Sequence, residues 1–225
     1  MSAPKITAMD WKRWHDNYDD PTQNFAARLE TVRERLRDAL DQAPAGPLRA
    51  LSLCAGQGRD LIPVLATHPR GRDVRARLVE LDPELAEDAR RAAADAGLTG
   101  VEVVTGDAAE TDHYRDLAPA DLVLVCGLYG NISDADIENT VATCAALCAT
   151  GGTVVWTRGR TRFPGLVTRI CDWYEQRGFE RLWISEPEVK LCVAAHRQTR
   201  EPAQFPAGQR MFEFVGYDVL QRDAD

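Results

Sequence analysis

Gly56, Gly58 and Glu80 have the types and spacing that a nucleotide site needs. The two glycines follow a short apolar run, and Glu80 ends a second apolar run further along the chain. Glycines let the backbone approach a ligand closely, and the free N–H groups at the start of the following helix face that ligand. An acid at the end of the second strand can accept hydrogen bonds from both hydroxyl groups of a ribose. The pattern therefore predicts a strand, a tight turn, a helix and a second strand that together bind a nucleotide.

The glycine spacing argues against a dinucleotide. A G-x-G-x-x-G fingerprint in this register would need three glycines, but the chain has Cys54, Gly56 and Arg59. The stretch from Ser52 to Gly58 instead resembles the first motif of the class I S-adenosylmethionine-dependent methyltransferases, acid-x-Gly-x-Gly-x-Gly. Ser52 stands where that family has the acid, which helps to hold the methionine end of the cofactor, and Cys54 stands where it has the first glycine.

Three later segments extend this resemblance. Glu80 matches the acid that binds the ribose, the run Val101 to Ala108 is similar to the third strand with its Gly-Asp beside the adenine, and the run Asp121 to Gly127 is similar to the fourth strand, at whose end methyl transfer takes place. The resemblance implies S-adenosylmethionine as the cofactor. It also implies a set of cofactor-binding residues, namely Cys54, Ala55, Gly56, Gly58, Glu80, Leu81, Asp107, Ala108 and Cys126.

The sequence assigns no catalytic residue. The methyl group sits on a positively charged sulfur, so the protein must chiefly align a nucleophile behind it and exclude water. Positioning lowers a barrier by roughly 7 to 11 kcal/mol, whereas a general base contributes roughly 10² to 10⁴-fold. The lack of an obvious base therefore does not argue against methyl transfer.

Five side chains are candidates for contact with the methyl acceptor. His15 and Tyr18 share a helical face in an N-terminal segment that the family often uses as a lid, although the same face could simply dock that segment. Tyr129 and Asn131 follow the fourth strand, where the alternative is a Gly-Asn turn with a packed tyrosine. Arg158, just past the fifth strand, is a candidate for binding an acidic acceptor, and the alternative is a surface arginine.

Charge and one missing motif favour a small-molecule acceptor. The formal net charge of −8 opposes attraction to phosphate backbones, so nucleic acid is an improbable partner. Residues 126–131 lack the Asn/Asp-Pro-Pro-aromatic motif of many enzymes that methylate bases. The basic run formed by arginines 70, 72, 75 and 77 is interpreted as a solvated loop before the second strand. Two alternatives stay open, a domain that holds the cofactor without transferring methyl, and an RNA or protein methyltransferase.

The order of elements predicts one α/β fold, a doubly wound, mostly parallel seven-stranded sheet with helices on both faces. Residues 1–47 are predicted to form an N-terminal helical cap or lid, and residues 48–225 one compact S-adenosylmethionine-binding domain. Three β-rich stretches (179–185, 189–196 and 210–216) compete for the last two strands. The resemblance implies that the final strand runs antiparallel between the fifth and the sixth.

Three short polar side chains are predicted to cap helices, Asp60, Asp82 and Ser133. A cap at Asp60 places Pro63 in the first turn, where proline is tolerated. Asp82 is accordingly interpreted as a cap, which leaves the ribose role to Glu80.

Composition sets the remaining expectations. No apolar run approaches the roughly 20 residues of a membrane helix, and the N-terminus lacks the apolar core of a signal peptide. We therefore expect a cytoplasmic protein with no membrane partner. The six cysteines include no C-x-x-C pair, so free thiols and no metal site are expected. The sequence leaves the oligomeric state open.

Overall fold

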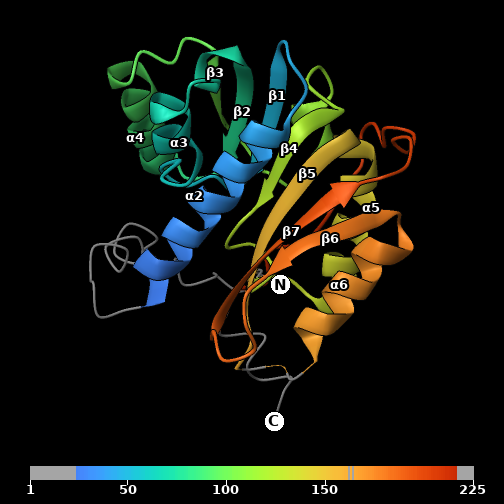
Figure 1. Ribbon diagram of the computed structural model, residues 1–225. Coiled ribbons are helices and arrows are strands. Elements are labelled where there is room, and N and C mark those ends of the chain that lie inside the picture. The colour runs from blue at the N-terminus through green and yellow to red at the C-terminus, as the bar shows by residue number, and fades with distance from the viewer. Residues whose placement is uncertain (1–23, 162, 164, 217–225) are drawn as a thin grey trace, which may run out of the picture.

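The computed structural model describes residues 24–161, 163 and 165–216 of the 225 in the chain. Within these residues, seven strands form one sheet in the order β3-β2-β1-β4-β5-β7-β6 (Figure 1). Its strands are β1 (Leu48–Leu53), β2 (Val74–Glu80), β3 (Val101–Thr105), β4 (Ala120–Val125), β5 (Cys148–Gly159), β6 (Phe179–Ile184) and β7 (Leu191–Gln198). Only β7 runs antiparallel to its neighbours β5 and β6, whereas the other pairs are parallel. The predicted fold class and the place of the last strand are confirmed.

Helices cover both faces of the sheet (Figure 1). They are α2 (Asn24–Gln42), α3 (Leu61–Thr67), α4 (Pro83–Asp95), α5 (Asp134–Leu147) and α6 (Leu166–Gln176), with short 3-10 turns η2 (Gly71–Asp73) and η3 (Thr111–Tyr114). Side chains of α2, α3 and α4 share one buried apolar cluster with the sheet, and those of α5 and α6 share another. The core is therefore two layers, one on each side of the strands.

Helix α2 belongs to the first of these layers. Its apolar stripe buries Val32, Leu36 and Leu40 against a cluster that includes Val155 of β5 and Val193 of β7. This stripe has the spacing of three and four residues that one helix face requires. The described half of the N-terminal region thus packs directly on the sheet.

The predicted helix caps are confirmed. The Asp60 carboxylate accepts a hydrogen bond from the Leu61 N–H, and that of Asp82 accepts from the N–H groups of Glu84 and Leu85. Ser133 accepts from the Asp136 N–H in the same way. Each carboxylate or hydroxyl thereby satisfies backbone donors that a helix start leaves unpaired.

The interpretation of the basic run as a solvated loop is wrong for its last two arginines. Arg75 and Arg77 lie within β2 and not in a solvated loop, and Arg77 is buried, with Glu102 and Asp116 at 2.7 Å and 3.1 Å from its guanidinium. A buried arginine needs such partners, which come from β3 and from the segment before β4, so the strand pattern alone did not reveal them. Strand β5 begins at Cys148 and includes Gly151 and Gly152, and its register against β4 shifts between Ala120 and Leu122.

The third β-rich stretch, 210–216, is not a strand of the sheet. It forms a single antiparallel bridge, between Arg210 and Glu110. In the described part of the chain, no helix combines the length and the apolar character that crossing a membrane requires.

Candidate functional site

The loop after β1 is a tight turn held by its own backbone. The Gly58 N–H donates to the Ala55 carbonyl at 2.9 Å, and the Ala55 N–H donates to Val79 O of β2 at 3.0 Å. Cys54, Gly56 and Gly58 all have left-handed backbone, with φ of +50°, +55° and +67°. Two of these positions carry the residue that tolerates this conformation, and Cys54 adopts it with a side chain.

Lack of space also requires that position 58 carry no side chain. A Cβ at this position would lie 2.5 Å from Cδ1 of Ile62 and 2.9 Å from Cδ2 of Leu78. The loop therefore lies directly on the start of α3 and on β2. This close packing fixes the direction in which the loop amides point.

Glu80 joins the loops that follow β1 and β2. One carboxylate oxygen accepts a hydrogen bond from the Gly56 N–H at 2.7 Å, and the other accepts from the Asp82 N–H at 2.8 Å. The Glu80 carbonyl also accepts from the Gly106 N–H of the third loop at 2.9 Å. Each carboxylate oxygen keeps a further acceptor position. Charge-assisted bonds to backbone amides hold this acid in one orientation at the carboxyl ends of the strands.

The loop after β3 places a second acid on the same edge of the sheet. One oxygen of Asp107 accepts from the Ala109 N–H at 3.0 Å, and the other lies 2.8 Å from Nη2 of Arg210. The buried Tyr114 hydroxyl donates to the Ala108 carbonyl at 2.8 Å and anchors the loop to the core. The side chain of Asp107 nevertheless stays 36% exposed, so it is open to a ligand.

The two thiols of the site are neutral. Burial, reinforced by the charges of Glu80 and Asp107, raises the pKa of the Cys54 thiol, and burial likewise raises that of Cys126. A thiol is a nucleophile only as a thiolate. Both cysteines are therefore small, uncharged residues that line the candidate site.

The end of β4 leaves room beside the loop after β1. Gly127 has φ +80°, and a Cβ there would meet no atom within 4 Å. Its N–H donates to the Thr157 hydroxyl of β5 at 2.9 Å, and its carbonyl accepts from the Asn131 side chain at 2.8 Å. These two bonds fix the turn after β4 without filling the space in front of it.

The acceptor candidates fall into different surroundings. Tyr129 is fully buried and its hydroxyl lies 2.7 Å from that of Tyr174, the arrangement of the packed-tyrosine alternative. Arg158 is only 6% exposed, at the end of β5, with its guanidinium 5.3 Å from the Phe163 ring centre, so it is not a surface arginine. Asn131 is half-buried in the turn after β4. The remaining candidates, His15 and Tyr18, lie outside the described residues.

These residues fit S-adenosylmethionine on several counts. Backbone amides line a loop without side chains at Gly56 and Gly58, and Glu80 offers two carboxylate oxygens for a ribose. Leu81, the next residue, is 66% exposed, so its apolar side chain is open to the face of a purine ring. Asp107 then offers an accessible acceptor further along the edge.

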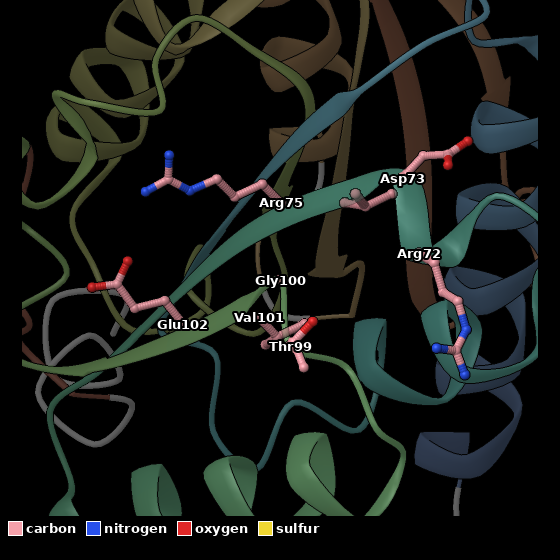
Figure 2. Close-up of a pocket in the computed structure, with 8 residues that line it drawn as sticks. Arg72, Asp73, Arg75, Thr99, Gly100, Val101 and Glu102 are labelled. Atoms are coloured by element: carbon pink, nitrogen blue, oxygen red, sulfur yellow. The ribbon is translucent and has the colours of Figure 1, made fainter.

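A separate hollow lies at the other ends of these strands. It is lined by residues 72–75 and 99–102, which precede or begin β2 and β3, whereas the glycine loop and Glu80 lie at the carboxyl ends. Figure 2 shows that Arg72 and Arg75 extend away from each other there. Their guanidinium groups do not converge on one ligand, so this hollow is not a candidate site.

Sequence reasoning missed two contributors to the site. Thr157 fixes the turn after β4 across 30 residues of sequence, and Arg210 reaches Asp107 across 103 residues. The stretch before Arg210 is rich in proline and glycine, a composition that favours a loop lying over the sheet edge. No spacing rule pairs an arginine in such a loop with one particular carboxylate.

Known proteins share this architecture. Residues 50–152 match a family model described as a methyltransferase domain. A magnesium protoporphyrin IX methyltransferase from Synechocystis PCC 6803, solved with bound S-adenosylmethionine, superposes with a TM-score of 0.62 at 14% identity, over 85% of this chain and 92% of that one. A TehB-like methyltransferase from Corynebacterium glutamicum gives 0.56 at 19% identity, over 84% and 95%.

The names of other matching structures indicate a different kind of methyl acceptor. A ribosomal protein L11 methylase from Lactobacillus delbrueckii subsp. bulgaricus superposes with a TM-score of 0.56 at 11% identity, over 77% of this chain and 80% of that one. A search of the curated proteins gives no match. At such identities the structural likeness shows a common fold and leaves the acceptor open.

Proposed function

We propose that this protein, whose residues 50–152 form a methyltransferase domain of the class I S-adenosylmethionine-dependent family, methylates an O, N or C atom of a small-molecule acceptor. The observation that carries the proposal is the position of Glu80, whose carboxylate is fixed by amides of two loops at one edge of the sheet. When bound, S-adenosylmethionine supplies a methyl group on a positively charged sulfur.

The protein's own residues would then bind the cofactor and orient it. In this proposal the amides of residues 54–58 face the methionine end of the cofactor, Glu80 accepts from the ribose hydroxyls, and Leu81 covers one face of the adenine. Asp107 and the Ala108 backbone meet the edge of the adenine, and Cys126 lies beside the methionine end. No described side chain is required as a base, because alignment and exclusion of water supply most of the acceleration.

The acceptor would enter from the ends of β4 and β5. Asn131 and Arg158 are the described residues that we assign to this side, and His15 and Tyr18 remain predictions for a lid formed by residues 1–47. Tyr129 is left out because its hydroxyl is engaged within the core. Arg158, at the end of β5, is the residue that we assign to an acidic group of the acceptor.

A small molecule is favoured over RNA by charge. The net charge of −8 repels a phosphate backbone, and the acids at the site, Glu80 and Asp107, add to that repulsion. The cytoplasmic location remains a prediction from the sequence.

Calorimetry with S-adenosylhomocysteine tests the cofactor assignment. Glu80→Gln keeps the shape and one acceptor oxygen but removes the charge, so we expect the affinity to fall by about 30-fold or more, the scale of one or two charge-assisted hydrogen bonds. Glu87→Gln, which removes an exposed carboxylate paired with Arg90 on α4, is the matched control and should bind as the wild type does. Unchanged affinity in Glu80→Gln, with the fold intact by circular dichroism, would contradict the ribose assignment.

The acceptor class is tested by label transfer. Protein is incubated with methyl-labelled S-adenosylmethionine and a cell extract that has been separated into small-molecule, RNA and protein fractions. Label in the small-molecule fraction, absent with Glu80→Gln, supports the proposal, whereas label in RNA or protein contradicts it. Tight cofactor binding with no transfer to any fraction would favour a cofactor-holding domain.

A further inference from the structure

Residues 199–216, here called the C-terminal strap, run from the end of β7, beside the start of β5, to the loops at the carboxyl ends of the strands that carry the candidate site. The strap leaves β7 with contacts to Gly178 and Thr150, and the Ala203 N–H then donates to the Ala145 carbonyl of α5 at 2.9 Å. It ends at the turn after β4, where the N–H groups of Val215 and Gly216 donate to the Asn131 carbonyl at 2.9 Å and 3.0 Å. The strap thus connects the adenine side of the site to the acceptor side.

Its middle part is fixed to the segment after β3. Thr111 donates from its N–H to the Gln209 carbonyl at 3.0 Å and from its hydroxyl to the Pro206 carbonyl at 2.6 Å. The Met211 N–H donates to the Ala109 carbonyl at 2.8 Å, and the Met211 side chain is buried. These backbone bonds on both sides of Arg210 set the position from which its side chain starts.

Arg210 bridges two acids of that segment. Its Nη2 lies 2.8 Å from Asp107 and its Nη1 lies 2.7 Å from Glu110. Because the Ala109 N–H occupies the other oxygen of Asp107, the carboxylate is held at both ends. The cation also offsets the repulsion between two acids of like charge.

We infer that Arg210 is a positioning residue for cofactor binding, which holds the Asp107 carboxylate in the orientation that accepts a hydrogen bond from the adenine 6-amino group. This inference rests on the proposed function, because it takes Asp107 to face the adenine. The strap is then a part of the cofactor site supplied from the end of the chain.

A purely structural role does not account for this geometry equally well. The side chain of Arg210 is 43% exposed and those of the two acids are 36% and 46% exposed, and exposed ion pairs contribute little to stability. The strap is already held by the backbone bonds around Thr111 and Met211. Removal of the Arg210 charge should therefore change ligand binding more than folding.

The test combines two protein variants with two ligands. Affinity is measured by calorimetry for S-adenosylhomocysteine and for its analogue with purine in place of adenine, which lacks the 6-amino group. We expect the wild type to prefer S-adenosylhomocysteine, and Arg210→Gln to bind it about 3- to 10-fold more weakly, the range of one hydrogen bond. Binding of the purine analogue should not change. Arg210→Lys, which keeps the charge, should recover part of the loss.

Arg37→Gln is the matched control. Arg37 is 40% exposed and lies 2.8 Å from Glu30 on α2, so the variant removes a similar ion pair away from Asp107. It should bind both compounds as the wild type does, and the melting temperatures of all variants should agree closely.

The outcomes separate this inference from the proposed function. Wild-type affinity of Arg210→Gln for S-adenosylhomocysteine would overturn the inference, and so would an equal loss for both compounds, which would indicate a general disturbance of the loop. A wild type that binds both compounds equally well would overturn the role of Asp107 toward the amino group but leave cofactor binding in place. A wild type that binds neither compound would overturn the proposed function itself.

Discussion

The two halves of the sheet use polar side chains in opposite ways. At the ends of β1, β2 and β3, backbone amides and one arginine hold Glu80 and Asp107, and the side of Asp107 and Leu81 that faces outward stays accessible. Between β5, β7 and α6, polar groups face one another in the core. The Trp156 indole donates to His196 at 3.2 Å, and the Tyr129 and Tyr174 hydroxyls meet at 2.7 Å, all in fully buried side chains.

This difference shows what a polar residue near a strand end signifies. Tyr129 and Asp107 both follow a strand of the same parallel sheet, and both residue types are common in ligand sites. The tyrosine has its partner in the core, whereas the aspartate retains exposed surface. Buried polar groups need partners to offset their desolvation, so such pairs stabilise the fold and are not free for a ligand.

A large effect is expected from acid, which should destabilise the buried polar groups between β5, β7 and α6. Burial, with a smaller effect of the nearby Arg181 cation, lowers the pKa of His196 to about 3, and a second proton would place an N–H donor against the Trp156 N–H. The unfolded chain takes up this proton near pH 6.5, so the stabilisation is present above that pH and is lost as the pH falls from 6.5 toward 3. We expect the free energy of unfolding to fall by about 2 kcal/mol from this residue between pH 7 and pH 5.

Urea denaturation at the two pH values checks this expectation. His196→Asn keeps an acceptor for Trp156 but does not titrate, so its unfolding free energy should depend less on pH than that of the wild type. Its affinity for S-adenosylhomocysteine at pH 7 should be unchanged. An identical pH dependence in both proteins would show that His196 does not carry the acid sensitivity.

In the half of the sheet formed by β1, β2 and β3, ligand affinity should depend on the backbone of the glycine loop. Gly58→Ala places a Cβ on a residue with φ +67°, and Gly97→Ala does the same at φ +66° after α4, where no atom lies within 4 Å of the new carbon. Gly97→Ala should lose about 1 to 2 kcal/mol of stability, the cost of left-handed backbone in a residue with a side chain. Gly58→Ala should lose more, because its Cβ would also lie 2.5 Å from Cδ1 of Ile62. Only Gly58→Ala should also bind S-adenosylhomocysteine more weakly, by about 10-fold, since a loop amide displaced from its ligand loses a hydrogen bond to it. Equal ligand affinity in the two variants would contradict the role of the loop.

The smallest effect is expected at Tyr129. Tyr129→Phe removes one hydroxyl from a buried pair, and Tyr174 keeps the Cys144 sulfur as a partner at 3.7 Å. The free energy of unfolding should therefore fall by about 1 kcal/mol, with no change in affinity for S-adenosylhomocysteine. A weaker ligand affinity at unchanged stability would show that Tyr129 contributes to the site and not only to the core.

Much of the fold follows from short-range signals. Asp60, Asp82 and Ser133 each precede an apolar helical pattern, and each caps its helix as predicted. These predictions succeed because a cap bonds to amides only one to three residues away. The start of β5 is the opposite case, since this strand begins at Cys148, where it pairs with Ala120, far back in the sequence.

By itself the sequence determined the α/β fold class, the succession of the first five strands along the chain and the acid that ends β2. Those features depend on apolar periodicity, on glycines at positions of left-handed backbone and on spacing along one strand–turn–helix–strand unit. Only the tertiary structure decided that Arg77 and Tyr129 are buried, that the stretch 210–216 is not a strand, and that Arg210 lies against Asp107. Each of these depends on contacts between segments distant in the chain, and residue types alone do not specify which distant groups will meet.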